Sequence, residues 1–147
     1  MIDDLVVFLR ARLDEDEEIA RKATARQPGG ETWMYDGTGV RAGSDLKVAW
    51  PQVPVIAEHI ARHDPARVLA EIDAKRQVIA PYAVALEERE SVRARMRKVL
   101  DSDQDEFMRL HRQESELIET ARVLAPAVQA LALPYADHTD YREDWRP

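Results

Sequence analysis

One stretch decides the fold: Asp64-Pro65-Ala66-Arg67-Val68-Leu69-Ala70-Glu71-Ile72. Asp64 is a preferred helix N-cap residue, and Pro65 suits the first helical position, where its missing N–H costs nothing. Apolar residues then return at steps of three and four, which is the spacing of one buried face on a helix. The stretch therefore predicts a long amphipathic helix, with apolar positions at Val68, Leu69, Ile72, Ile79, Tyr82, Ala83 and Leu86.

A second amphipathic pattern follows a charged stretch over residues 87–100. Asp101-Ser102-Asp103 can end one helix and cap the next. Residues 65–124 therefore predict a central αα-hairpin. Pro81 is expected to kink or interrupt the first helix, and Pro126 to end the second before a last short helical segment, because proline removes a backbone hydrogen bond. The apolar positions of the second helix are Phe107, Leu110, Leu117, Ile118, Ala121 and Leu124.

Upstream of the hairpin, residues 3–25 predict an N-terminal helix that Asp3 or Asp4 can cap and that Gln27-Pro28-Gly29-Gly30 ends. Residues 31–50 carry aromatic and β-branched runs around an Asp36-Gly37 turn, which predicts a small antiparallel β-sheet of two or three strands. The alternation of Leu46, Val48 and Trp50 with polar or small residues predicts one buried face of that sheet. A short helix over residues 55–63 follows.

Together these elements predict an α+β fold, mostly α-helical, in a single domain over residues 1–147. The 33% of charged residues and only 5 glycines suit long solvated helices. A net charge of -7 disfavours nucleic acid at long range, and the absence of Cys excludes disulfides and thiolate metal sites. The acidic N-terminus and the short apolar runs lead us to expect a cytoplasmic protein without membrane contact.

The C-terminal tail, residues 134–147, has no helical period but carries two Tyr and one Trp. A disordered tail usually lacks aromatic residues, so we expect an ordered tail that packs on the helical body. The alternative is a docking element for a protein partner, in which aromatic and arginine side chains act as anchors. Its partner-binding residues would be Tyr141, Arg142, Trp145 and Arg146.

His59 and His63 lie four residues apart, so a helix places both imidazoles on one face. This is the geometry of a two-histidine metal half-site, to which Asp64, Glu58, His111 or His138 could add a ligand. The alternative is a helix end whose histidines cap carbonyl groups or contact the tail. The first interpretation predicts a metal-dependent hydrolase or nuclease; no other pattern in the chain indicates a cofactor.

A basic cluster formed by Arg93, Arg95, Arg97 and Lys98 follows Arg89 in the charged stretch. It could bind nucleic acid, but on a helix it spreads over more than one face and contains no aromatic platform for bases. Glu87, Glu88 and Glu90 lie beside it, so intrahelical ion pairs are the favoured interpretation.

The sequence lacks the motifs that are typical of common enzyme classes. It contains neither a phosphate-cradling glycine motif nor a G-x-S-x-G elbow, and it has no Cys nucleophile. The leading prediction is therefore a non-enzymatic protein-interaction or regulatory module, which we expect in a phage or mobile-element setting. Long charged amphipathic helices can pair between chains, so we also expect a homodimer.

Three segments of the sequence stand out, and they are Asp3-Asp4-Leu5-Val6-Val7-Phe8-Leu9-Arg10-Ala11-Arg12-Leu13-Asp14-Glu15-Asp16, Ala57-Glu58-His59-Ile60-Ala61-Arg62-His63-Asp64-Pro65-Ala66-Arg67-Val68-Leu69 with Ala74-Lys75-Arg76, and Leu131-Ala132-Leu133-Pro134-Tyr135-Ala136 with Asp140-Tyr141-Arg142-Glu143-Asp144-Trp145-Arg146-Pro147. Together they resemble a small actinobacterial family of unknown function, whose members occur in bacterial chromosomes and in actinobacteriophage or prophage settings. The resemblance covers both ends and the centre of the chain. Family members often carry Cys pairs between the central and closing segments, which suggests a zinc knuckle; this chain has none, so any metal here would need the histidines.

Overall fold

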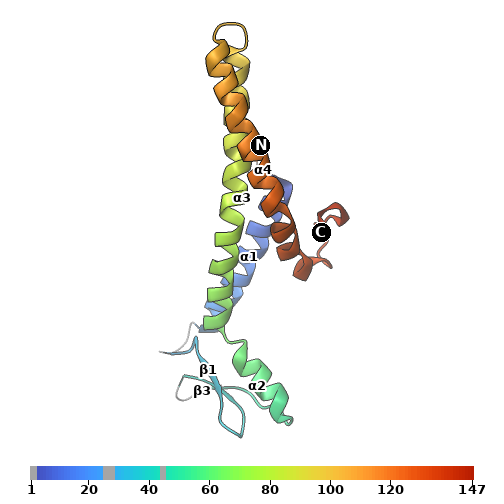
Figure 1. Ribbon diagram of the computed structural model, residues 1–147. Helices are drawn as coiled ribbons and strands as arrows, with labels where there is room; N and C mark the ends of the chain where they lie inside the picture. The colour runs from blue at the N-terminus through green and yellow to red at the C-terminus, as the bar shows by residue number, and fades with distance from the viewer. Residues whose placement is uncertain (1–2, 25–28, 44–45) are drawn as a thin grey trace. The chain divides into compact units, whose positions relative to one another are not determined.

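The computed structural model describes residues 3–24, 29–43 and 46–147 (Figure 1). The described chain is mostly helical with one small sheet, so the predicted α+β class is confirmed. The elements in order are α1 (Asp4–Thr24), β1 (Trp33–Tyr35), β2 (Val40–Ala42), β3 (Leu46–Ala49), α2 (Pro54–Arg62), α3 (Pro65–Val99), α4 (Gln104–Ala132) and two 3-10 turns, η1 (Leu133–Tyr135) and η2 (Glu143–Trp145).

The chain divides into two compact units. The hairpin unit comprises Met1–Ala11 and Lys75–Pro147, and the sheet unit comprises Arg12–Ala74. Both α1 and α3 contribute residues to each unit, because the division falls inside these helices. The two units are described in turn.

The hairpin unit is built on α3 and α4, which run antiparallel and are joined by a short turn over residues 100–103 (Figure 1). Asp103 caps α4, because its carboxylate accepts a hydrogen bond of 2.9 Å from the Glu106 N–H. The predicted αα-hairpin is thus confirmed. Its core also includes the first turns of α1, and its buried side chains include Leu5, Val6, Phe8, Leu9, Ile79, Tyr82, Ala83, Val92, Leu110, Val128 and Ala132.

Neither proline interrupts its helix. α3 continues through Pro81, and α4 continues through Pro126 to Ala132. The predictions of an interruption at Pro81 and of a helix end at Pro126 are therefore wrong. Both prolines are exposed, as are Gln77 and Arg122, the residues whose carbonyl groups lose a helical partner. Water can satisfy such carbonyls, while the buried face holds the helix together across each proline.

The N-terminal cap of α1 is Asp3, as one of the two predicted alternatives stated. Its carboxylate accepts a hydrogen bond of 2.9 Å from the Leu5 N–H, and its carbonyl accepts one of 3.1 Å from the Val7 N–H. The helix ends at Thr24. Of the predicted stop signal, Gln27 and Pro28 lie outside the described residues.

The sheet unit holds three antiparallel strands in the order β1-β2-β3, which confirms the predicted sheet. The Asp36-Gly37 turn joins β1 to β2. One Asp36 oxygen accepts hydrogen bonds from the Thr38 N–H at 2.8 Å and the Gly39 N–H at 3.0 Å. Gly37 has a φ of 88°, a left-handed conformation that glycine adopts without strain.

The buried face of this sheet differs from the prediction. β2 supplies its buried residues, Val40 and Ala42, and α2 packs on β1 and β2. A bulge between Val40 and Arg41 changes the register with β3, so a simple two-residue alternation does not describe that strand. Leu46 is exposed, and Trp50 lies beyond the end of β3 with 67% of its surface exposed. The prediction that Leu46, Val48 and Trp50 form one buried face is therefore wrong.

One helix in the described part of the chain is long and apolar enough, by length and composition alone, to cross a membrane. It spans Gln104–Tyr135, and only 11% of its most apolar window is buried. The ion-paired Glu119 and Arg122 lie within it, so its apolar run is interrupted. A single helix of this kind is a weak indication, and the absence of membrane contact stays a prediction.

Candidate functional site

The C-terminal tail packs on the first turns of α1 around Phe8. The Phe8 ring centroid lies 5.0 Å from that of Trp145, which is only 8% exposed. Edge-on contacts at 5.7 to 6.3 Å complete the cluster, an arrangement that aromatic rings favour. The tail is thus ordered and its aromatic side chains serve the fold, and the other rings of the cluster belong to Tyr135, His138 and Tyr141.

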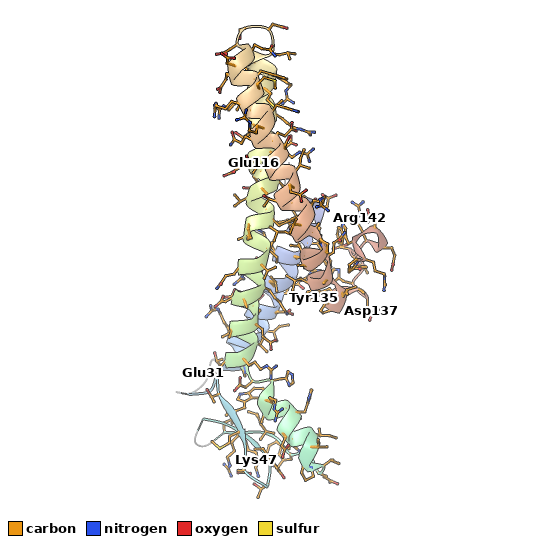
Figure 2. All side chains as sticks on the ribbon, in the orientation of Figure 1. Glu31, Lys47, Glu116, Tyr135, Asp137 and Arg142 are labelled. Atoms are coloured by element: carbon orange, nitrogen blue, oxygen red, sulfur yellow. The ribbon has the colours of Figure 1, made fainter. Side chains whose placement is uncertain are left out.

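The two arginines of the tail remain at the surface. Figure 2 shows Arg142 on the C-terminal tail. Arg142 donates to both oxygens of Asp144, at 3.1 and 2.7 Å, and to Asp4 at 3.1 Å. Arg146 donates to Glu143 at 3.2 Å. The bonded carboxylates raise the pKa of both guanidinium groups. Of the four predicted partner-binding residues, the fold uses the two aromatic ones, so docking through the tail stays a prediction that would depend on the arginines.

The two histidines of the predicted metal site lie at the end of α2. Their ring centroids are 4.3 Å apart. The Nδ1 atom of His63 lies 2.9 Å from the His59 carbonyl oxygen, and the His63 backbone N–H also donates to this oxygen. The sequence prediction of a shared face is therefore correct. The position of the His63 ring against this carbonyl matches the alternative interpretation, a histidine that caps a helix end.

Asp64, the first candidate for a third metal ligand, already accepts hydrogen bonds from two backbone N–H groups. One carboxylate oxygen accepts the Arg67 N–H at 2.8 Å, and the other accepts the Trp33 N–H at 3.1 Å. Asp64 thus caps α3 as predicted and also fixes the start of β1. Across residues 3–24, 29–43 and 46–147, no three His, Cys, Asp or Glu residues are grouped to hold a metal ion. Metal binding by His59, His63 and Asp64 stays a prediction without a visible third ligand.

The basic cluster of α3 faces carboxylates across the hairpin. Arg93 donates to Glu114 at 2.6 Å and Arg95 donates to Glu106 at 3.0 Å, while the Arg89 guanidinium lies 3.6 Å from Glu114. The hydrogen bond from Arg93 is the main cause of a lowered pKa at Glu114. One of the expected pairs within α3 is present, between Arg93 and Glu90 at 3.6 Å. The pairs with Glu106 and Glu114 join α3 to α4 and were not predicted. This compensation reduces the charge available to nucleic acid, and binding through Arg97 and Lys98 stays a prediction.

The sequence that contains all of these sites matches the model of one known protein family. A model described as a family of unknown function, DUF6221, matches residues 2–147. The chain belongs to the DUF6221 family. No curated protein and no solved structure matches it significantly. Because the family description names no activity, the function of this DUF6221 chain has to be inferred from its own geometry.

The hairpin unit of the DUF6221 chain contains a polar cavity of about 260 Å³ beside the tail, here called the tail pocket. Tyr82 lines it and is 8% exposed, and burial followed by the charge of Asp3 raises its pKa. Sequence reasoning counted Tyr82 only as an apolar position of α3. The available signal was a hydroxyl group within an otherwise aliphatic stripe, because a buried hydroxyl needs a partner. The polar wall is completed by Asp3, Asp4, Gln129, Arg142 and Asp144.

The sheet unit exposes large apolar side chains in the link after β3 and in the first turn of α2. Trp50 and Val55 are each 67% exposed, and Val53 and Ile56 are exposed as well. These four residues lie within seven consecutive positions and are called the apolar segment below. The same unit has an apolar cleft of about 210 Å³ lined by residues that include Ile19, Trp33 and Val68. Sequence reasoning missed the apolar segment because it assigned Trp50 to a buried strand face.

Proposed function

We propose that this DUF6221 chain is a non-enzymatic protein-interaction or regulatory module that binds its partner through the apolar segment. The observation that carries the proposal is the exposure of Trp50 and Val55. Neighbouring large apolar side chains in contact with water are unfavourable for a free protein, and such surfaces mark interaction sites. Trp50 further supports the proposal, because tryptophan is among the residues that contribute most to binding energy at protein interfaces.

The chemistry of the ionisable groups supports a non-enzymatic role. A carboxyl group that acts as a general acid at neutral pH needs a raised pKa. Every carboxyl group in the described ranges whose pKa is resolved as shifted has a lowered pKa. In each case the main cause is a hydrogen bond from a neighbouring arginine or lysine side chain. These lowered pKa values belong to Glu18, Asp36, Glu106, Glu114 and Glu119.

The partner is a protein with an apolar groove. The apolar segment carries no charged side chain between residues 50 and 56, so it offers a partner burial and shape rather than ion pairs. Interfaces of this kind are weakened most when a central aromatic anchor is removed. We expect Trp50 to be that anchor.

Two further properties belong to the proposal. The three quoted sequence segments support an actinobacterial origin with phage or mobile-element relatives, and the genes beside the encoding gene would test this. Exposed apolar side chains on both helices of the hairpin, among them Val84 and Val123, support a homodimer, and we propose the cytoplasm as its location.

The proposal is tested with immobilised protein and lysate of the source cells. The double variant Trp50→Ala, Val55→Ala is compared with wild type and with Ile19→Ala, which removes another apolar side chain of the sheet unit that is also 67% exposed. We expect wild type and Ile19→Ala to retain the same protein in stoichiometric amount. The double variant loses it while its circular dichroism is unchanged, because exposed side chains contribute little to folding.

Equal retention by all three proteins would contradict the proposal. Loss in Ile19→Ala alone would also contradict it, since the partner would then occupy the apolar cleft instead. Purified partner and titration calorimetry would convert the comparison into a ratio of dissociation constants. We expect the double substitution to weaken binding by at least about 2 kcal/mol, the size that defines a hot spot.

A further inference from the structure

The hairpin unit contains another cavity, close to the turn that joins α3 to α4, and this cavity is called the turn pocket below. Its volume is about 250 Å³, and half of its lining residues are apolar, namely Met96, Leu100 and Phe107. Leu100 is 53% exposed. Because apolar surface gains free energy when it leaves water, the turn pocket favours a ligand with an apolar body.

The charged part of the wall selects the sign of that ligand. Arg93 and Arg97 contribute two positive charges and Glu114 contributes one negative charge, so the wall carries a net charge of +1. The chain as a whole carries a net charge of -7. A locally positive wall on an acidic protein favours an anion.

The arginines on this face of α3 outnumber the carboxylates that they contact on α4. Arg89, Arg93 and Arg97 follow one another at a spacing of four residues, so they share a face of the helix. Glu114 accepts a hydrogen bond of 2.6 Å from Arg93 and lies 3.6 Å from the Arg89 guanidinium. The Arg89 Nε atom is buried, and no group in the described part of the chain accepts its N–H. A buried donor without an acceptor is unfavourable and calls for an explanation.

Arg97 also lacks an anionic partner. Arg93 donates to Glu114 and Arg95 donates to Glu106, but within residues 3–24, 29–43 and 46–147 no hydrogen bond or ion pair reaches the Arg97 side chain. A guanidinium group has five N–H donors, so Arg93 can bond to a second carboxylate as well as to Glu114. A ligand carboxylate between Arg93 and Arg97 would therefore make up the deficit of negative charge on this face.

We propose that the turn pocket binds a small carboxylate with an apolar body. Its oxygens accept N–H groups of Arg97 and Arg93, since guanidinium and carboxylate groups form strong charge-assisted hydrogen bonds, and its hydrocarbon part contacts Leu100 and Phe107. A phosphate monoester carries about -1.5 to -2 charges at pH 7, which exceeds the charge of the wall. The cavity is smaller than the roughly 300 Å³ at which sites for drug-sized ligands begin, so it suits a short chain. The inference is independent of the proposed partner surface, which lies in the sheet unit.

A free acid suits this wall better than the C-terminus of a protein. A peptide brings backbone N–H and C=O groups, which are unfavourable to bury without hydrogen-bond partners. Apart from its charged groups, the turn pocket offers only the side chains of Met96, Leu100 and Phe107. The ligand is therefore a free small molecule.

The test is a titration of the full chain with hexanoate, followed through the methyl signal of Met96 by nuclear magnetic resonance. Met96 lines the turn pocket, and Met34 in the sheet unit provides a reference signal that should not move. We expect a saturable shift with a dissociation constant on the order of 1 mM, as befits so small a ligand. 1-Hexanol has the chain without the charge, and acetate has the charge without the chain. Both should bind about fivefold more weakly or worse, and hexylammonium should not bind, because it brings the wrong charge.

Two variants locate the site, each with a matched control. Arg97→Gln removes the charge but keeps a good helix former, and Lys98→Gln removes the next charge along α3, which does not line the pocket. Leu100→Ala shortens an apolar wall residue, and Val84→Ala shortens an exposed residue of α3 elsewhere. Arg97→Gln should weaken hexanoate binding by about fivefold or more, and Leu100→Ala should weaken it measurably. Both controls should bind like wild type, with circular dichroism showing that all four variants are folded.

Several results would overturn the proposal. They are the absence of a Met96 shift with hexanoate, equally tight binding of 1-hexanol, and undiminished binding in a folded Arg97→Gln variant. Equal losses in Arg97→Gln and Lys98→Gln would also overturn it, because they would reveal a diffuse attraction to the basic cluster. Tighter binding of N-acetyl-Ala-Leu than of hexanoate would assign the cavity to a protein C-terminus instead of a free acid.

Discussion

At the scale of single residues, Asp64 shows how one carboxylate serves two elements. Its two oxygens accept the N–H groups of Arg67, in the first turn of α3, and of Trp33, the first residue of β1. The neighbouring backbone adds a third link, because the Ala66 N–H donates to the Glu31 carbonyl at 2.9 Å. The helix start that was visible in the sequence is therefore also an anchor for the sheet.

We predict that Asp64→Ala lowers the free energy of unfolding by about 2 kcal/mol, the sum of a lost cap and a second orphaned N–H. Asp64→Asn should cost roughly half as much, because its single carbonyl oxygen can still cap α3 but its NH₂ group cannot accept from Trp33. Urea denaturation measures both values. Equal loss in the two variants would show that charge rather than hydrogen bonding is at work.

At the scale of elements, the two internal prolines are the clearest departure from sequence rules. Proline in a helix interior is unfavourable, yet α3 and α4 both continue through one. Tertiary packing decides here, because the buried residues on either side of each proline belong to one apolar face. A local rule about Pro81 or Pro126 contains no information on that packing.

We predict that Pro81→Ala stabilises the protein by about 1 to 2 kcal/mol. The substitution restores a helical hydrogen bond, and part of the gain is offset by the greater freedom of the unfolded chain. The thermal midpoint should rise, with Gln77→Ala as a control for a change at an exposed site nearby. A lower midpoint for Pro81→Ala would mean that the ring or a bend at this position is needed by the fold.

The sequence could predict features that depend on neighbouring residues, but not features that depend on tertiary packing. The helices, the hairpin and the caps at Asp3, Asp64 and Asp103 were predictable, because each depends on residues close together in the chain. The buried face of the sheet was not, because a bulge at Val40 has no local signature. The tail pocket was beyond reach as well, since it combines residues from the beginning, middle and end of the chain.

Two other sites were visible only in part. The pairing of His59 with His63 was predictable from their spacing, but the two backbone bonds that occupy Asp64 were not. The basic cluster was recognised, but its bonds to Glu106 and Glu114 depend on the register between α3 and α4. Inter-helix register is a property of packing, which one sequence does not show.

At the scale of the whole molecule, exposed apolar side chains on the hairpin unit bear on its state of association. We predict that sedimentation equilibrium gives twice the chain mass of 16.8 kDa. Val123→Glu, at a position 61% exposed on α4, should return the mass to that of a single chain because it places a charge in the interface. Thr139→Glu adds the same charge in the tail and should leave the dimer intact. A single-chain mass for wild type at all concentrations would refute the prediction.

The contact between the tail and α1 has a consequence for how the protein is made. Phe8 leaves the ribosome well before Trp145, because most of this sequence lies between them. The apolar side of α1 around Phe8 therefore lacks its final cover until Trp145 has also been synthesised. Chains that stop short of residue 145 would keep that side open to water, which makes them natural clients of chaperones and early targets of proteases.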